Sequence, residues 1–172
     1  MRALNRKSIC NGNTAEKIEA VVLCLLNERK QTLALAESCT GGFIANQITN
    51  MPGASEIFLG GIVAYSNAVK QKFLSVRAET LKRHGAVSEA VAREMAVGAR
   101  KKFGADFAIA VTGIAGPGGG TKDKPVGTVF IALAGKFGTT VERKLNFLER
   151  AAFKRLTAQQ ALEMLRLRLI CS

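Results

Sequence analysis

The 172-residue sequence contains no tryptophan, one tyrosine and one histidine. It has no apolar run of the ~18 residues that a membrane-spanning helix needs, and no apolar segment typical of an export signal follows the charged N-terminal residues 1–8. We therefore expect a soluble, cytoplasmic protein. Apolar residues make up 48% and charged residues 22% of the chain, which argues against intrinsic disorder. We expect one domain spanning residues 1–172, long enough to bury a continuous core.

Ligands for a zinc ion are also scarce. The four cysteines lie far apart without a C-x-x-C pair, and His84 is the only histidine. His84 lies between two predicted helices, so a contact at a helix end is a simpler role for it than catalysis.

Positive charge, by contrast, is abundant. The chain has 25 Lys and Arg against 13 Asp and Glu, a net charge of +12. An anionic partner fits this balance, whether nucleic acid, an acidic protein or a small phosphorylated metabolite. Aromatic residues are only 6% and the basic residues are spread along the chain, which argues against nucleic acid. Because two-fold homodimers are the commonest soluble oligomers, we also expect a homo-oligomer, with a dimer favoured.

Helix-like and strand-like segments alternate along the chain. Asn13 and Glu16 form a possible capping box for the first helix. The apolar spacing predicts helices over residues 18–26, 43–49, 89–103 and 150–170. Short apolar or β-branched runs predict strands over residues 32–37, 61–65, 107–112, 126–134 and 139–146, the last at a sheet edge. This order predicts an α/β layered domain with a mostly parallel or mixed central sheet.

In such sheets ligands bind at the carboxyl ends of the strands. The loops that follow three predicted strands are residues 38–42, 65–70 and 112–121. Ser38 lies in the first, just before a predicted helix, where backbone N–H groups would suit a nucleophile and stabilise an oxyanion. Alternatively Ser38 only caps this helix. Cys39 is a rival nucleophile that would need His84 as its base.

The second loop contains Tyr65, the only tyrosine, and leads to Lys70, which we expect to lie in the following helix. A lysine can replace histidine as the base for a serine nucleophile. To act near pH 7, its pKa must fall by roughly three units from a reference of ~10.4, through burial or a nearby cation. The alternative is an ordinary solvated lysine.

Five glycines fall between residues 113 and 120 of the third loop. Such a loop lets backbone N–H groups approach phosphate oxygens, although it matches neither the dinucleotide nor the P-loop signature. A flexible connection is the alternative. Arg150, at the start of the last predicted helix, is either a solvated charge or a clamp for an anion.

Together these segments resemble the CinA C-terminal domain family, which includes stand-alone, PncC-type nicotinamide-nucleotide amidohydrolases. The matching stretches are AESCTGG (36–42), YSN with Lys70 (65–70), HGAVSE (84–89), VTGIAGPGGG (111–120) and KPVGT (124–128). The family usually has Gly-Asp-Arg before its final helix, whereas this chain has Leu148-Glu149-Arg150.

The resemblance implies a three-layer α/β/α domain that hydrolyses the carboxamide of nicotinamide mononucleotide to nicotinate mononucleotide and ammonia. It implies that Ser38 attacks the amide carbon, Lys70 takes the proton and Tyr65 relays or orients, with no metal or organic cofactor. The substrate-binding residues that it implies are Thr40, Gly41, Gly42, Ser66, Asn67, Thr112, Gly113, Ala115, Gly116 and Arg150. The alternatives are a non-catalytic nucleotide- or phosphate-binding module linked to competence or the DNA-damage response, and direct DNA binding.

Overall fold

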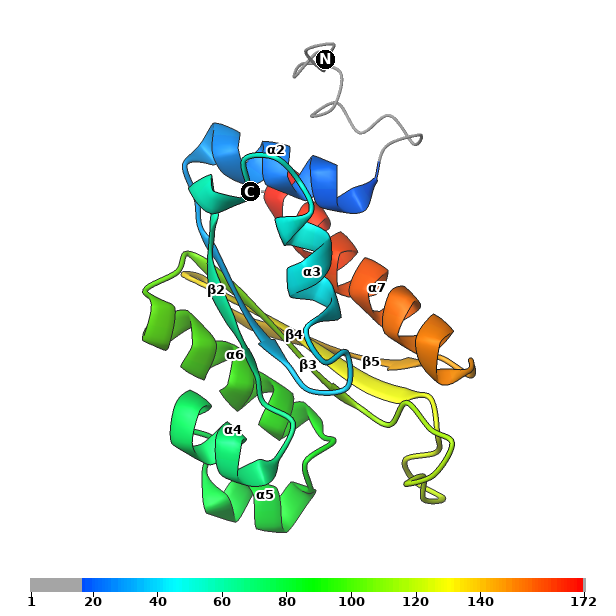
Figure 1. The fold of residues 1–172 in the computed structure, drawn as a ribbon. Coiled ribbons are helices and arrows are strands. Elements are labelled where there is room, and N and C mark those ends of the chain that lie inside the picture. Colours follow the sequence, from blue (N-terminus) through cyan, green and yellow to red (C-terminus); the bar gives the residue numbers. More distant parts are fainter. Residues whose placement is uncertain (1–16, 172) are drawn as a thin grey trace.

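A single mixed sheet forms the centre of the molecule (Figure 1). The computed structural model describes residues 17–171. Its strands are β1 (Leu33–Glu37), β2 (Phe58–Val63), β3 (Phe107–Gly113), β4 (Thr128–Gly135) and β5 (Gly138–Leu145), in the spatial order β2-β1-β3-β4-β5. β1 pairs in parallel with β2 and β3, whereas β4 is antiparallel to both β3 and β5.

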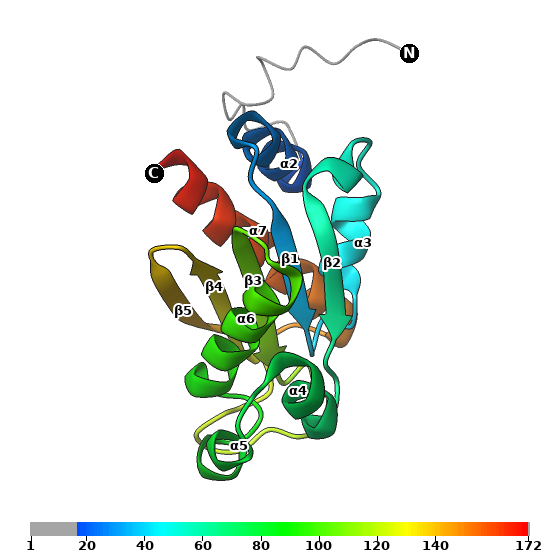
Figure 2. The ribbon, with the colours of Figure 1, turned by 90° about the vertical axis from the view of Figure 1, so that its left-hand side faces the viewer.

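Helices cover both faces of this sheet (Figures 1 and 2). The helices are α2 (Ile18–Arg29), α3 (Phe43–Thr49), α4 (Asn67–Leu74), α5 (Ala78–His84), α6 (Glu89–Phe103) and α7 (Arg150–Ile170), with a short 3-10 turn at Ala54–Glu56. One face carries α2, α3 and α7, and the other carries α6 with α4 and α5 beside it. The expected three-layer α/β/α architecture is therefore present.

The two faces of the sheet differ in side-chain size. In β1, Leu33 and Leu35 enter the core beneath α2, α3 and α7, while Ala34 and Ala36 enter the core beneath α6. β3 repeats the pattern with Ile109 and Val111 on the first face and alanines on the second. Because helices cover both faces of the sheet, the sequences of these strands are almost continuously apolar. The alanine face lets α6, itself rich in buried alanine, pack closely on the strands.

Most predicted elements are confirmed, and the differences follow from position in the sheet. The helices at 43–49, 89–103 and 150–170 have the predicted bounds. The strand predicted at 61–65 is instead Phe58–Val63, and it alternates between half-buried and exposed because β2 is an edge strand. The helix expected to carry Lys70 is α4, although its bounds were not predicted, and His84, expected between two helices, is the last residue of α5. The capping box at Asn13 and Glu16 lies outside the described residues.

Within residues 17–171, none of the helices combines the length and the apolar character that a membrane span would need.

Candidate active site

The three predicted loops meet at one edge of the sheet. They follow β1, β2 and β3, which run in the same direction, so their carboxyl ends lie side by side above α4 (Figure 2). The topology therefore brings together segments that lie up to about eighty residues apart in the sequence.

Ser38 and Lys70 are in direct contact at this edge. Lys70 Nζ lies 3.0 Å from Ser38 Oγ, and it donates to the backbone oxygens of Ala64 at 2.6 Å and Tyr65 at 3.5 Å. Both side chains are buried, with Lys70 only 1% exposed. Ser66 sets the direction of α4, and hence of Lys70, because its hydroxyl accepts the N–H of Val69 at the start of that helix.

Burial lowers the pKa of Lys70 below its ordinary value of 10.5. The cause is the loss of hydration of the ammonium group, and among the described residues no carboxylate forms an ion pair with it. A neutral amine can donate to the two backbone oxygens and still accept the proton of Ser38 through its lone pair. The arrangement is that of a serine with a lysine base.

Glu37, which the sequence analysis did not single out, holds the loop that carries Ser38. Its buried carboxylate accepts the backbone N–H groups of Gly42, Ile44 and Ala45 at 2.8–3.1 Å. The expectation that Ser38 occupies the N-terminus of this helix is therefore wrong. A carboxylate competes best for free N–H groups at a positive helix end, and Glu37 takes that place. An acidic residue just before a glycine pair and a helix was the available signal.

Two backbone N–H groups directly follow Ser38 in the turn. Among the described residues, the N–H groups of Cys39 and Thr40 donate no hydrogen bond to backbone or side-chain oxygen. Both N–H groups interact with the Cys39 sulfur. Burial raises the pKa of its thiol, and these two N–H groups lower it by less. Thr40 is fully buried, and its hydroxyl also has no partner in the described part of the chain. The Thr40 hydroxyl is thus a buried polar group without the partner that such groups normally have.

Cys39 does not suit the role of nucleophile. Burial raises the pKa of its thiol to about 12, which leaves almost no thiolate at neutral pH. His84, the base it would need, is exposed at the end of α5, where its backbone oxygen accepts from Lys124 Nζ at 2.7 Å. As expected, His84 has a structural position at a helix end.

Tyr65 and Arg150 form the outer part of the site. The Arg150 guanidinium donates to the Tyr65 hydroxyl at 2.9 Å and to the backbone oxygen of Gly116 at 2.7 Å. Arg150 thus connects the loops after β2 and β3 to the start of α7. Tyr65 is 63% exposed, and its backbone oxygen, rather than its hydroxyl, contacts Lys70.

The comparisons with known proteins identify the family. The profile of the CinA C-terminal domain matches residues 15–169. The chain belongs to the CinA C-terminal domain family. CinA-like proteins of Parasynechococcus marenigrum and Thermotoga maritima are 52% and 51% identical to it over 94% and 90% of this chain. The chain spans only 39% and 38% of the length of these relatives.

Solved structures of CinA proteins share the fold. The competence/damage inducible protein CihA of Agrobacterium tumefaciens is 39% identical, with a TM-score of 0.85 over 88% of this chain and 93% of its own. A CinA superfamily protein of Klebsiella pneumoniae is 34% identical, with a TM-score of 0.86 over 91% of this chain and 100% of its own.

The other substrate-binding residues predicted for this CinA domain lie in the same three loops. Gly41 and Gly42 adopt positive φ in the turn after Ser38, and Asn67 begins α4 beside Ser66. The Thr112 hydroxyl donates to Ala86 O, and Gly113 ends β3. Ala115 is buried beside Gly116, whose φ is +73°.

This chain has Leu148-Glu149-Arg150 where CinA proteins usually have Gly-Asp-Arg, and the last helix still has a capping residue. Glu149 is the N-cap of α7, and its carboxylate accepts the N–H of Ala152 at 3.0 Å. Because an acidic side chain still stabilises the positive end of the helix, the start of α7 and the position of Arg150 are maintained.

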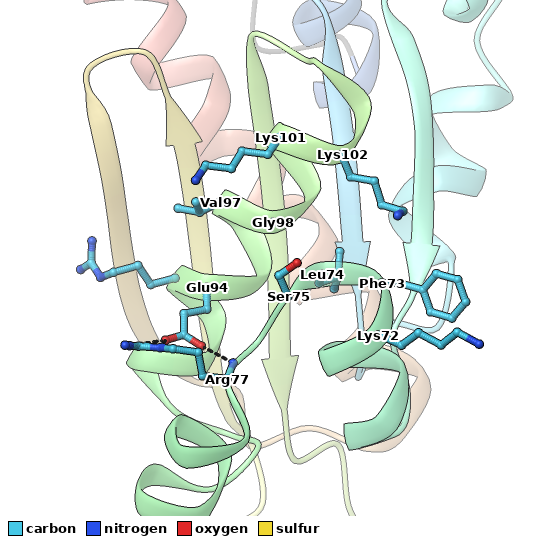
Figure 3. A pocket seen from close by; sticks show the side chains of 11 residues that line it. Lys72, Phe73, Leu74, Ser75, Arg77, Glu94, Val97, Gly98, Lys101 and Lys102 are labelled. Carbon is cyan, nitrogen blue, oxygen red and sulfur yellow. Dashed lines mark hydrogen bonds and ion pairs between the residues drawn. The ribbon is translucent and has the colours of Figure 1, made fainter.

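A separate cavity of about 600 Å³ lies between α4 and α6 of the CinA domain (Figure 3). Phe73, Leu74 and Val97 line it together with several lysines. Its one carboxylate, Glu94, is held by Arg77 and Thr80. Neither Ser38 nor Lys70 lines this cavity, so its size alone does not mark the reactive site.

Metal-ligating side chains do not cluster in the described chain. Among residues 17–171, no three His, Cys, Asp or Glu side chains come together in an arrangement that could hold a metal ion.

Proposed function

We propose that this chain is an amidohydrolase that hydrolyses the carboxamide of nicotinamide mononucleotide, giving nicotinate mononucleotide and ammonia. The observation that carries the proposal is the buried Lys70 amine 3.0 Å from the Ser38 hydroxyl, with no carboxylate of residues 17–171 paired to it. A lysine of lowered pKa next to a serine is a recognised activated nucleophile. The family to which the chain belongs supports the choice of an amide as the substrate.

The reaction starts with neutral Lys70 taking the proton of Ser38 Oγ as this oxygen attacks the carboxamide carbon. The tetrahedral intermediate collapses when protonated Lys70 returns that proton to the amide nitrogen, which leaves as ammonia. Water then attacks the resulting ester with Lys70 again as base. Ser38 recovers its proton and the free carboxylate leaves. Each step moves one proton between groups in hydrogen-bond contact.

The negative charge on the tetrahedral intermediate requires hydrogen-bond donors already in place. We assign this role to the N–H groups of Cys39 and Thr40, which directly follow Ser38 in the chain and donate to no oxygen within residues 17–171. Each donor of this kind contributes roughly 10²–10³-fold in rate in serine hydrolases. Glu37 supports them, because it holds the turn by binding the amides that follow.

Incubation of the purified protein with nicotinamide mononucleotide, with measurement of ammonia and nicotinate mononucleotide, tests the proposal. Ser38→Ala and Lys70→Ala should each lower kcat by roughly 10³-fold or more. Lys72→Ala is the matched control, because it removes an exposed lysine from the same helix. Its kcat should stay within about twofold of wild type.

Two results would contradict the proposal. One is the absence of turnover in the wild-type protein, and the other is unchanged turnover in Ser38→Ala. Binding of the nucleotide that survives Ser38→Ala without any product formation would instead support a non-catalytic nucleotide-binding module.

A further inference from the structure

Lys154 is a second cation of α7 that faces the loop carrying Ser38. It lies one helical turn after Arg150, and its Nζ is 5.9 Å from the centre of the Phe43 ring, at the start of α3. A Cβ built on Gly41 would lie 3.7 Å from this Nζ. The ammonium group is therefore held close to the turn that follows the nucleophile, and Gly41 leaves the space between them open.

The Lys154 side chain is half-buried and has no anionic partner. Within residues 17–171 it forms no ion pair, although its neighbour Arg155 approaches Glu149 at 3.9 Å. A cation packed on an aromatic ring is partly held in place. It can bind an anion without first breaking an ion pair within the protein.

Arg150 differs in this respect, because it is already engaged. Its guanidinium donates to the Gly116 backbone oxygen and to the Tyr65 hydroxyl, both neutral acceptors. To bind a phosphate with the same donors it would have to release one of these loops. Lys154 needs no such rearrangement, and a lysine binds phosphate as a point charge.

We propose that Lys154 binds the phosphate of the nucleotide substrate and thereby makes the site selective for the phosphorylated form of its amide. This inference rests on the proposed function. The substrate lies with its carboxamide at Ser38 and its phosphate at Lys154, on the outer side of the Gly41 turn. Arg150 then acts mainly to hold the Tyr65 and Gly116 loops in place.

The test compares Lys154→Met with Arg155→Met on two substrates, nicotinamide mononucleotide and its riboside, which lacks the phosphate. Arg155→Met is the matched control, because it removes one positive charge from the next, 60% exposed position of the same helix. In Lys154→Met we expect KM for the mononucleotide to rise roughly 10–100-fold with kcat nearly unchanged. Neither KM nor kcat for the riboside should change, and Lys154→Arg should recover most of the affinity.

Competition by inorganic phosphate gives a second readout that does not depend on riboside turnover. Phosphate should inhibit wild type competitively, and at least about tenfold more weakly in Lys154→Met. The thermal unfolding of Lys154→Met is measured alongside, and Lys154→Gln is used if it is poorly folded.

The two hypotheses fail in different ways. If wild type hydrolyses neither substrate, the proposed function is wrong. If wild type hydrolyses the mononucleotide and Lys154→Met has an unchanged KM, the role of Lys154 is wrong. An equal loss on both substrates, or the same loss in Arg155→Met, also overturns the role of Lys154 and leaves the proposed function intact.

Discussion

The Arg150 guanidinium donates to the hydroxyl of Tyr65 at 2.9 Å, across 85 positions of the sequence. This contact turns the phenol toward α7, while the backbone oxygen of the same tyrosine accepts from Lys70. Tyr65 therefore joins the outer part of the site to the buried pair of Ser38 and Lys70. We therefore expect the hydroxyl to orient rather than to relay a proton.

Tyr65→Phe should therefore lower kcat/KM much less than removal of the Lys70 amine does. We expect kcat/KM for nicotinamide mononucleotide to fall by roughly tenfold, because one hydrogen bond to a charged group is lost. Lys70→Ala should lower it by about 10³-fold or more. Steady-state kinetics of the two variants gives the comparison, and equal losses would assign the Tyr65 hydroxyl to the proton transfer.

The pH dependence of catalysis should follow Lys70. Burial lowers the pKa of its amine below 10.5, and the reaction needs the neutral form. The value of kcat/KM should therefore rise with pH through this lowered pKa and then reach a plateau. Measurements between about pH 5 and pH 10 give the profile. An increase that begins only near 10.5 would show that Lys70 is an ordinary, solvated lysine.

The free energy of unfolding should also depend on pH through Lys70, and the direction of this dependence follows from the lowered pKa of its amine. The folded protein holds Lys70 at a lowered pKa, so it binds fewer protons than the unfolded chain between that pKa and 10.5. The free energy of unfolding of wild type relative to Lys70→Met must then rise with pH across this window. Below the window Lys70 is protonated in both states, so the difference is constant and the full cost of the buried charge is present.

Thermal unfolding of both proteins over this pH range provides the measurement. Lys72→Met serves as the control, because it removes an exposed lysine from the same helix. A difference that falls as pH rises would mean that the folded protein stabilises the ammonium form of Lys70.

Glu37→Gln should weaken the loop that carries Ser38. The carboxylate accepts three N–H groups at the start of α3, and an amide offers only one acceptor oxygen and no charge. We expect the free energy of unfolding to fall by about 1–3 kcal/mol and kcat to fall as well, measured by urea unfolding and by turnover. Glu56→Gln, at an exposed position, should change neither.

Gly98→Ala should disturb the site from a distance. A Cβ at this position of α6 would clash with the backbone oxygen of Leu74, the last residue of α4. Because backbone cannot give way as a side chain can, we expect a loss of about 1–3 kcal/mol or more in urea unfolding. Activity should also fall, since α4 carries Lys70. Gly118→Ala meets no atom within 4 Å and should leave stability unchanged.

Local patterns in the sequence were sufficient to predict much of the fold. The apolar spacing of residues 89–103 and 150–170, with Ser88 before the first and Gly104 after it, predicts these helices because such signals act within a few residues. The edge strand β2 was predicted with shifted bounds, and the short helices α4 and α5 were predicted without bounds. Their exposure and length depend on neighbours that are distant in the sequence.

For the candidate site, the order of residues is enough to show which reactive groups lie in its loops. The chain provides one serine before a glycine turn, one lysine after a tyrosine and a scarcity of histidine, and these predict a serine nucleophile with a lysine base. The distance between those groups and the pKa of the lysine depend on how the chain folds. The sheet brings the ends of β1 and β2 together, which places Lys70 against Ser38 and removes its water. Glu37, meanwhile, is turned to the amides of α3, and within residues 17–171 no carboxylate forms an ion pair with Lys70, whose pKa is lowered by burial. Desolvation is a property of all the surrounding atoms together, and no local stretch of sequence contains it.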